Sequence, residues 1–167
     1  MLTTTLRACL LAGLLSLAPA LAAAKTWTIP DPNPTAVVTI PDDWETSKIK
    51  YGIETTSDDE DIYMAIEVTD GNSVEQDIEA TIKWYQSKGV RIDAKSQKQG
   101  PFKLNGMEGY TIYWDAKDDD GPTQVTLMVL QTSDKKGLLI SVWGSEEAQK
   151  ENAKELDSIM ESIRGVK

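Results

Sequence analysis

Apolar and polar residues alternate along most of the chain, which is the pattern of a β-strand with one buried face. The clearest example runs from Ile62 to Val68, where nearly every second side chain is apolar and falls on one face. Asn105 and Gly106, which lie between two such runs, predict a tight hairpin turn. Short runs rich in β-branched and aromatic residues predict further strands at residues 36–40, 49–55, 90–95, 102–104, 107–116, 123–131 and 138–143.

One of these strands, the next to last, is apolar on both faces. Val125, Leu127 and Val129 fall on one side of it, and Met128 and Leu130 fall on the other. A strand of this kind is covered by other elements on both sides, because neither face tolerates water. We therefore expect it to lie in the middle of the sheet.

In two segments the apolar residues recur with a period of about 3.6 residues instead of every second residue. This periodicity predicts two helices. In the first, Ser73 and Gln76 form a capping-box pattern at the start, and Gly89 marks the end. Trp84 lies about 120° away from the apolar stripe of this helix. The stripe consists of Val74, Ile78, Ile82 and Tyr85.

The second helix is predicted from an N-cap at Ser145 to about Arg164, before Gly165. Its apolar stripe consists of Ala148, Leu156, Ile159, Met160 and Ile163. The order of elements predicts an α+β domain with one mostly antiparallel sheet of about six to seven strands and two main helices packed on it. Periodicity leaves open whether the helices cover one face of the sheet or both.

The N-terminal segment has the pattern of a secretory signal peptide. Arg7 precedes a short apolar stretch, and a small-residue segment that fits cleavage after Ala22 or Ala24 follows it. We expect residues 1–24 to be removed and residues 25–167 to form one domain. The proline-rich residues 25–35 are expected to be an extended lead-in. The protein is then periplasmic or secreted and is not inserted in the membrane after cleavage.

Composition narrows the chemistry further. The chain has 17 basic and 27 acidic residues, a net charge of −10, and no histidine. Such a charge repels phosphate backbones, so nucleic acid is not an expected partner. Its one cysteine, Cys9, lies in the signal segment, so the mature domain has neither thiol nor imidazole for catalysis or metal binding. No cofactor is expected, and a disulfide-free core must supply the stability of a monomer.

Trp44 and Trp84 raise the question whether an indole serves the core or a ligand. Trp44 follows a strand that ends at Pro41 and a turn at Asp42 and Asp43, and we expect it to cover the end of the core. The alternative is a platform on which a ligand stacks. Trp84 is expected to cover the rim of the core, with a partner-binding patch as the alternative.

Two acidic turns are the only candidates for a cation site. One spans residues 58–61, and the other contains Asp118, Asp119 and Asp120 before Gly121. Clustered carboxylates are ligands that Ca²⁺ accepts, but the spacing of an EF-hand loop is not met. We expect solvated hairpin tips, and no metal site is assigned.

The order of elements, the segment from Ile40 to Trp44 and the segment from Gly106 to Tyr110 together resemble the PsbP-like family. That family includes a Ran-binding nuclear-transport factor and periplasmic DcrB-type proteins. The resemblance covers nearly all of the mature chain and implies an α/β/α sandwich. It also implies a non-enzymatic role in binding or assembly, although no ligand motif of the family carries over to particular residues here.

The sequence therefore favours a secreted or periplasmic accessory protein that binds a protein partner or small ligand without catalysis. A related possibility is an envelope-maintenance protein that acts through another exported protein. The alternative is a hydrolase that acts on envelope glycan or peptide with two converging carboxyl groups, one of raised pKa. The sequence assigns no catalytic or cofactor-binding residue for either function.

Overall fold

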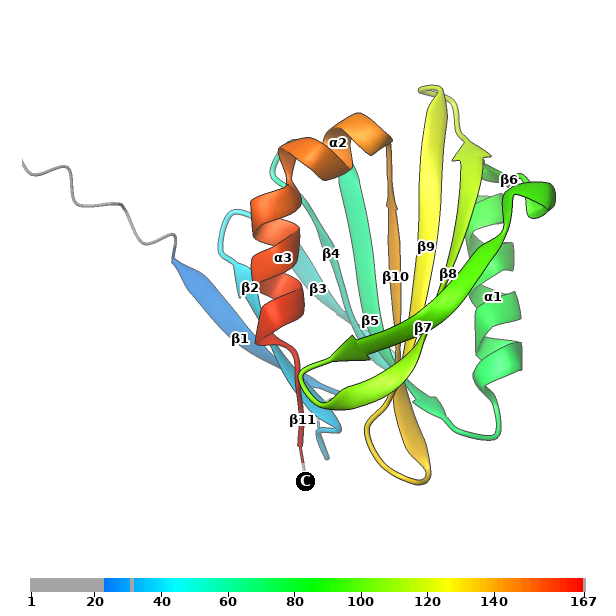
Figure 1. Ribbon diagram of the computed structural model, residues 1–167. Helices are drawn as coiled ribbons and strands as arrows, with labels where there is room; N and C mark the ends of the chain where they lie inside the picture. The colour runs from blue at the N-terminus through cyan, green and yellow to red at the C-terminus, as the bar shows by residue number, and fades with distance from the viewer. Residues whose placement is uncertain (1–22, 31, 167) are drawn as a thin grey trace, which may run out of the picture.

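The computed structural model describes residues 23–30 and 32–166, which form an α+β domain (Figure 1). Most of the expected signal segment, residues 1–22, lies outside the described residues. The strands are β1 (Ala24–Ile29), β2 (Ala36–Pro41), β3 (Glu45–Ile49), β4 (Gly52–Thr56), β5 (Ile62–Asp70), β6 (Arg91–Ile92), β7 (Lys98–Leu104), β8 (Met107–Lys117), β9 (Pro122–Gln131), β10 (Lys136–Gly144) and β11 (Arg164–Gly165). The helices are α1 (Val74–Ser87), α2 (Glu146–Glu151) and α3 (Ala153–Ser162), with one 3-10 turn, η1 (Ala94–Ser96).

The strands form two antiparallel sheets. The larger sheet has eight strands in the order β3-β4-β5-β10-β9-β8-β6, and β7 also pairs with β8. The smaller sheet has the order β1-β2-β11. The predicted α+β class is confirmed, but the single sheet of six to seven strands is wrong. The proline-rich lead-in and the end of the chain both pair with β2, and they build a second sheet.

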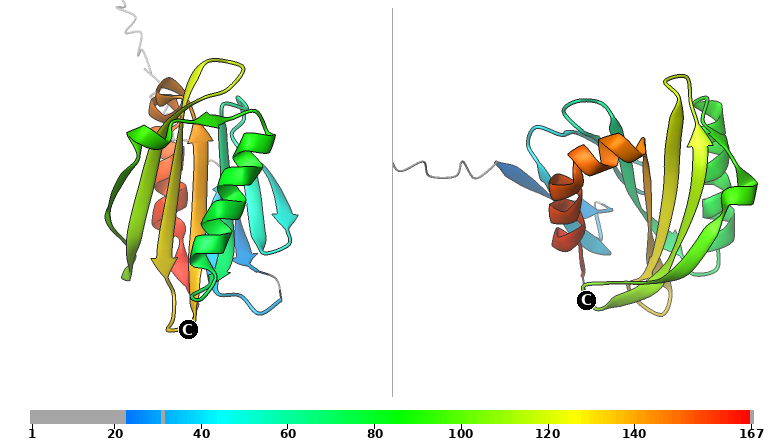
Figure 2. Two further views of the ribbon diagram at one scale, coloured as in Figure 1. Left: turned by 90° about the vertical axis from the view of Figure 1, so that its right-hand side faces the viewer. Right: turned by 45° about the horizontal axis from the view of Figure 1, so that its top comes forward.

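Apolar cores lie on both faces of the large sheet. The helix α1 covers one face with all four residues of its predicted stripe, and α3 covers the other face together with β1 and β2 (Figures 1 and 2). The strand β9 contributes to both cores, as predicted. Val125, Leu127 and Val129 belong to the α1 core, and Met128 and Leu130 belong to the α3 core. The helices thus lie on opposite faces of the sheet.

The predicted strand over residues 49–55 is confirmed only for residues 52–55, because a hairpin turn at Lys50 and Tyr51 separates them from Ile49. The turn joins β3 to β4, which pair along their whole length. Gly52 begins β4 where β4 approaches β5 very closely. A Cβ atom at this position would lie only 1.9 Å from the Ile66 carbonyl oxygen. The β-branched pattern alone does not contain this constraint.

Both helices differ in detail from their predictions. At the start of α1, Ser73 makes no side-chain cap, and its hydroxyl instead donates to Asp77 over 3.0 Å. The capping box with Gln76 is therefore wrong. Ser145 does cap α2, since its hydroxyl accepts a hydrogen bond from the backbone of Ala148. The predicted terminal helix breaks at Asn152 into α2 and α3 and ends at Ser162. The predicted strand over residues 90–95 is also shorter, because η1 follows β6.

Trp44 is part of the core, as expected. Its side chain is only 4% exposed and belongs to the α3 core, where strands of both sheets and α3 meet. Pro41 ends β2 immediately before the turn that leads to this indole. The interpretation of Trp44 as a platform for a ligand is wrong, because both faces of a buried ring are covered by protein.

The hairpin between β7 and β8 holds the end of α3. Asn105 and Gly106 have φ angles of 50° and 83°, as the predicted tight turn requires. The Asn105 amide then donates toward the carbonyl oxygens of Met160, Glu161 and Ile163, the shortest contact being 2.7 Å to Ile163. One side chain thereby satisfies carbonyl groups that the helix end leaves without partners. Within residues 23–30 and 32–166, no helix is long and apolar enough to cross a membrane.

Candidate functional site

A cleft of about 410 Å³ lies beside α1 on one face of the large sheet. Its floor is formed by β5 and β10, and its walls are α1 and the β3–β4 hairpin, which lies next to the helix in the side view (Figure 2, left). We call it the α1 cleft. The lining residues that matter most are Lys50, Tyr51, Glu54, Glu67, Asp77 and Trp84.

The alternation in β5 places a carboxyl group in this cleft. The apolar residues of β5 that predicted the strand all point into the α3 core, so the residues between them face α1. Glu67 is one of these, and it is half-buried. Its cross-strand neighbours are Leu139 on β10 and Gly52 on β4. Gly52 carries no side chain, and a Cβ atom there would lie only 2.9 Å from the Glu67 Cα atom, so no side chain of β4 lies opposite Glu67.

Two other carboxylates of the α1 cleft are held by hydrogen bonds. Glu54 accepts one from the Ser47 hydroxyl at 3.1 Å and one from the Tyr63 hydroxyl at 3.0 Å. Asp77 accepts one from Thr69 at 2.5 Å and one from Ser73 at 3.0 Å. These bonds fix the orientation of both groups and compensate their negative charge.

Glu67 differs from them, because no group among residues 23–30 and 32–166 donates a hydrogen bond to its carboxylate. Burial raises the pKa of Glu67, and the negative charges of Asp77 and Glu54 raise it further. A carboxylate in this position costs free energy while it is ionised and unpaired. The α1 cleft thus contains one carboxylate to which no described residue donates a hydrogen bond.

A cluster of four aromatic rings borders the α1 cleft. Tyr63 and Trp84 are stacked, with ring centroids 4.9 Å apart. Tyr85 meets Tyr63, Trp84 and Trp143 in edge-on geometry at 6.3, 5.2 and 5.9 Å. Such packing makes this wall of the cleft rigid.

The Tyr85 hydroxyl is an unusual member of this cluster. It is completely buried, and it has no hydrogen-bond partner at proper geometry in the described part of the chain. Burial raises the pKa of Tyr85; the Ser141 hydroxyl opposes that shift, and the negative charge of Glu67 adds to it. Ser141 and Glu67 both line the floor of the α1 cleft. A second incompletely satisfied polar group therefore lies beside this floor.

The structure places Trp84 at the edge of the α1 core and on the wall of the α1 cleft. The amino group of Lys88 lies 5.3 Å from the centre of its ring. The expectation that Trp84 covers the rim of the core agrees with this position. Its role in binding a partner stays a prediction.

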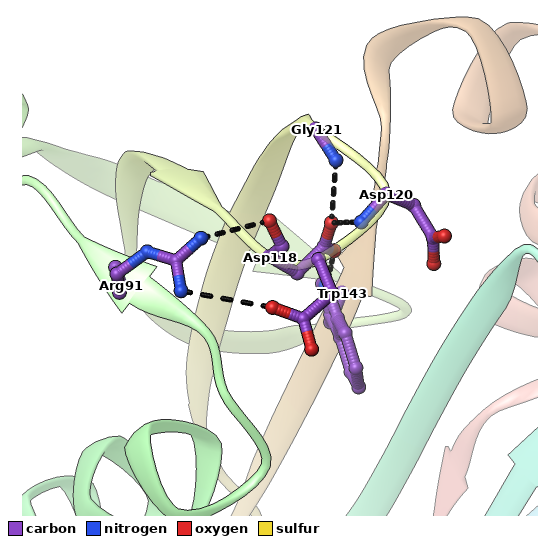
Figure 3. Close-up of polar contacts among 6 residues, drawn as sticks. Arg91, Asp118, Asp120, Gly121 and Trp143 are labelled. Atoms are coloured by element: carbon purple, nitrogen blue, oxygen red, sulfur yellow. Dashed lines mark hydrogen bonds and ion pairs between the residues drawn. The ribbon is translucent and has the colours of Figure 1, made fainter.

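The turn of Asp118, Asp119 and Asp120 is organised by its own hydrogen bonds (Figure 3). The Asp118 carboxylate accepts bonds from the backbone of Asp120 and Gly121 at 3.0 and 3.1 Å, and from the Trp143 indole at 3.0 Å. Arg91 donates to the Asp118 carbonyl oxygen at 2.9 Å and pairs with Asp119 at 3.7 Å. Asp118 therefore shapes the turn and anchors an indole of the aromatic cluster.

The other acidic turn, at residues 58–61, binds the segment where the C-terminal helix breaks into α2 and α3. Asp59 accepts hydrogen bonds from Ser57 at 2.5 Å and from the Asn152 amide at 3.0 Å. These bonds, that from Ser57 first, hold the pKa of Asp59 below its usual range. Asn152 lies between α2 and α3. The sequence gives no sign of this link, because 93 residues separate the two partners.

A second cleft, of about 350 Å³, lies beyond Tyr63 and Trp143 at the end of the sheet where both acidic turns are found. It is lined by carboxylates from three segments: Glu60, Asp61, Asp118, Asp120, Glu147 and Glu151. In the part of the chain that the structure describes, no three acidic or cysteine side chains are arranged to hold a metal ion. We therefore assign no metal site to this cleft, although acidic residues gather there.

The α1 cleft was not found by sequence reasoning. Of its main lining residues, the sequence singles out only Trp84; the carboxylates come from three different elements, Glu54 from β4, Glu67 from β5 and Asp77 from α1. One signal was available, because a helix that directly follows a strand tends to cover one of its faces. Glu67 then becomes a charged residue under a helix, which is uncommon.

Comparisons with known proteins identify the fold. No family model and no curated protein sequence matches the chain. Among solved structures, cyanobacterial PsbP (CyanoP) from Synechocystis has a TM-score of 0.59 at 11% identity, with 92% of this chain and 100% of that chain covered.

Two further structures have the same fold. LpqN of Mycobacterium tuberculosis, described as involved in cell envelope biogenesis, has a TM-score of 0.52 at 13% identity over 84% of this chain and 90% of that chain. The yeast Ran-binding protein Mog1p has a TM-score of 0.50 at 7% identity over 87% and 96%. The chain therefore has a PsbP-like fold, as the resemblance in its sequence implied.

Proposed function

We propose that this protein is an exported, non-catalytic binding module that acts through the α1 cleft. The observation that carries this proposal is the preformed cleft with Glu67, a half-buried carboxylate to which no described residue donates a hydrogen bond. A fold retains such a group at a cost in stability, and a bound partner that supplies the missing donor offsets that cost. Two proteins of the same fold support a role in binding or assembly, since one is named as Ran-binding and the other as involved in envelope biogenesis.

Export is supported by the N-terminal pattern and by the start of the fold. The strand β1 begins at Ala24, and the Ala23 carbonyl oxygen accepts a hydrogen bond from the Asp42 backbone at 2.9 Å. Cleavage after Ala22 leaves both residues in the mature chain, whereas cleavage after Ala24 removes them. We therefore favour Ala22 as the last residue of the signal peptide, which places the domain in the periplasm or outside the cell.

The absence of histidine supports a role without catalysis, as does the absence of cysteine from the expected mature domain. The hydrolase alternative has one observation in its favour, because Glu67 has a raised pKa and interacts with the charges of Glu54 and Asp77. However, Glu54 and Asp77 each already accept two side-chain hydrogen bonds. These bonds give both carboxylates structural partners within the fold, so we rank hydrolysis second. Hydrolysis of chromogenic glycosides or peptides that Glu67→Gln abolishes would reverse this order.

The proposal is tested by NMR titration of the isotope-labelled domain with four small probes of similar size. The probes are n-butylammonium, n-butylguanidinium, n-butanol and butyrate. We expect at least one probe to shift the backbone signals of Glu67, Thr81 and Leu139 and the indole signal of Trp84, all of which line the cleft. Saturable shifts confined to these signals support a binding site. If none of the four probes shifts them, or if shifts are spread evenly over the surface, the α1 cleft is not the binding site.

A further inference from the structure

The α1 cleft has an excess of negative charge close to apolar surface. Three carboxylates and one basic residue, Lys50, are found among its described lining residues. Glu54 and Asp77 have their hydrogen-bond donors within the fold, whereas Glu67 has none among the described residues. From this arrangement we propose that the cleft binds an organic cation, an alkylammonium or guanidinium group, whose charged end pairs with Glu67. The inference rests on the proposed function and specifies its ligand.

A cation is the guest that the charges favour. A half-buried carboxylate beside two other carboxylates repels anions, and a neutral guest leaves its charge unpaired. An N–H-bearing cation supplies both the opposite charge and the missing hydrogen-bond donor. Among the described residues, no group of acidic or cysteine side chains is arranged to hold a metal ion.

The walls of the α1 cleft suit the carbon stem of such a cation. Ala65, Leu139 and Ala80 provide apolar surface near Glu67, and the ring of Trp84 continues it. The volume of about 410 Å³ lies toward the small end of the range for ligand sites. The stems of lysine and arginine side chains commonly lie along apolar surface while the charged end reaches a polar group. One such side chain, or a small free amine, fits this combination of size and chemistry.

Two of the protein's own lysines place their ammonium groups over aromatic rings of the cleft, Tyr51 and Trp84. The Lys50 amino group lies 4.7 Å from the ring centre of Tyr51, and that of Lys88 lies 5.3 Å from the ring centre of Trp84. Both contacts have the distance of a cation–π interaction. Lys50 lines the cleft itself, so it competes with an incoming cation for the negative potential. Removing its charge is therefore expected to strengthen binding.

The Tyr85 hydroxyl is a second polar group close to the floor of the α1 cleft. It is completely buried and has no partner of hydrogen-bond geometry in the described chain, and it lies within electrostatic reach of Glu67. Neither the Ser141 hydroxyl nor the Glu67 carboxylate satisfies it at proper geometry. Tyr85 is completely buried and is not one of the lining residues of the cleft, so its hydroxyl adds an unsatisfied polar group near Glu67 without itself contacting a guest.

The four-probe titration described above also tests the class of the ligand. At low ionic strength we expect n-butylammonium and n-butylguanidinium to bind about tenfold more tightly than n-butanol, and butyrate not to bind. If n-butanol or butyrate binds as tightly as the cations, the binding module stands and the cationic ligand is wrong. If no probe affects the cleft, both proposals fail. Binding by either of two further cations, an amidated Gly-Lys-Gly peptide or spermidine, agrees with the inference, and the tighter of the two indicates whether a protein side chain or a free polyamine is the source.

Three variants separate specific binding from the general attraction of an acidic protein. Glu67→Gln keeps the shape of the side chain and is expected to weaken cation binding about tenfold. Glu79→Gln makes the same change of charge on α1, where the side chain is 71% exposed and does not line the cleft, and is expected to alter binding less than twofold. Lys50→Gln is expected to tighten binding. Equal effects of Glu67→Gln and Glu79→Gln would overturn the inference, provided that the melting curves show both variants folded.

Discussion

At the scale of single residues, Glu67 illustrates how the proposed binding role opposes stability. Its carboxylate lies on a face of the sheet that a helix partly covers, and burial with two neighbouring carboxylates raises its pKa. A glutamate whose folded-state pKa exceeds its unfolded value destabilises the fold when ionised. That cost is complete above the folded-state pKa, and it disappears when the pH falls below the ordinary value of 4.5.

The first prediction follows from the destabilising effect of ionised Glu67. Glu67→Gln is expected to raise the melting temperature at pH 7 by roughly 2 °C, because an unpaired charge is replaced by a neutral amide of the same shape. The gain should shrink as the pH is lowered and vanish below about 4.5, where Glu67 is protonated in both states. The other groups that act on it, Asp77 and Glu54, remain in place. Thermal unfolding across this pH range checks the prediction, and a lower melting temperature of the variant at pH 7 would contradict it.

Trp44 supplies a second test at this scale. Trp44→Ala is expected to lower the free energy of unfolding by roughly 3–5 kcal/mol, since it leaves a large cavity in the α3 core. Tyr51→Ala is the matched control, because its ring is 51% exposed and its loss is expected to cost less than about 1 kcal/mol. Denaturant unfolding of both variants measures the difference. Equal stability of the two variants would be inconsistent with the position of Trp44 in the core.

At the scale of elements, most strands are predictable from the sequence, whereas the helix ends and the contacts that hold them are not. The alternation from Ile62 to Val68 and the two apolar faces of β9 are predictive because their apolar side chains are the ones that the two cores bury. The helix ends depend instead on contacts between residues that are far apart in the sequence. Asn152 ends one helix and binds Asp59, while Asn105 holds the end of another, and neither partner is adjacent in the sequence. For the same reason the α1 cleft was missed, since it is formed by the face of β5 that carries no apolar signal.

The contact of Asn105 with α3 gives a prediction at this scale. Asn105→Gly tolerates the positive φ angle and loses only the amide, so we expect a loss of about 1 kcal/mol in the free energy of unfolding. Asn105→Asp has a similar shape but brings a negative charge to three carbonyl oxygens, and it is expected to be less stable than the glycine variant. Urea unfolding of both proteins orders them. An aspartate variant as stable as the wild type would show that the amide does not support the helix end.

The start of β1 gives a second prediction at the scale of elements. A chain that begins at Ala23 is expected to be more stable than one that begins at Lys25, by roughly 1 kcal/mol, because the shorter chain lacks the hydrogen bond from Asp42 and the pairing of Ala24 with Pro41. Thermal unfolding of the two purified chains measures the difference. Indistinguishable melting temperatures would remove the structural support for cleavage after Ala22, and the mass of the exported protein would then decide the cleavage site alone.

At the scale of the whole molecule, the two clefts and the two cores have different origins. The cores follow from the apolar pattern, which places α1 on one face of the large sheet and α3 with the small sheet on the other. The clefts arise where these layers do not fully cover the sheet, beside α1 and at the end that carries the acidic turns. The aromatic cluster lies between them, since Tyr63 lines both clefts. The aromatic cluster thus forms the part of the core that separates the two clefts.

The position of β10 has a consequence for the order in which the protein can be completed. In the large sheet, β10 is the strand that joins β5 to β9, so the strands made earlier form two separate meanders until it is inserted. A nascent polypeptide that has not yet reached Gly144 therefore has no continuous sheet on which the layers can close. Pairings between such distant segments form slowly. A chain whose large sheet stays divided until about its last fifth is synthesised remains competent for threading through a narrow translocation channel, as the export proposed above requires.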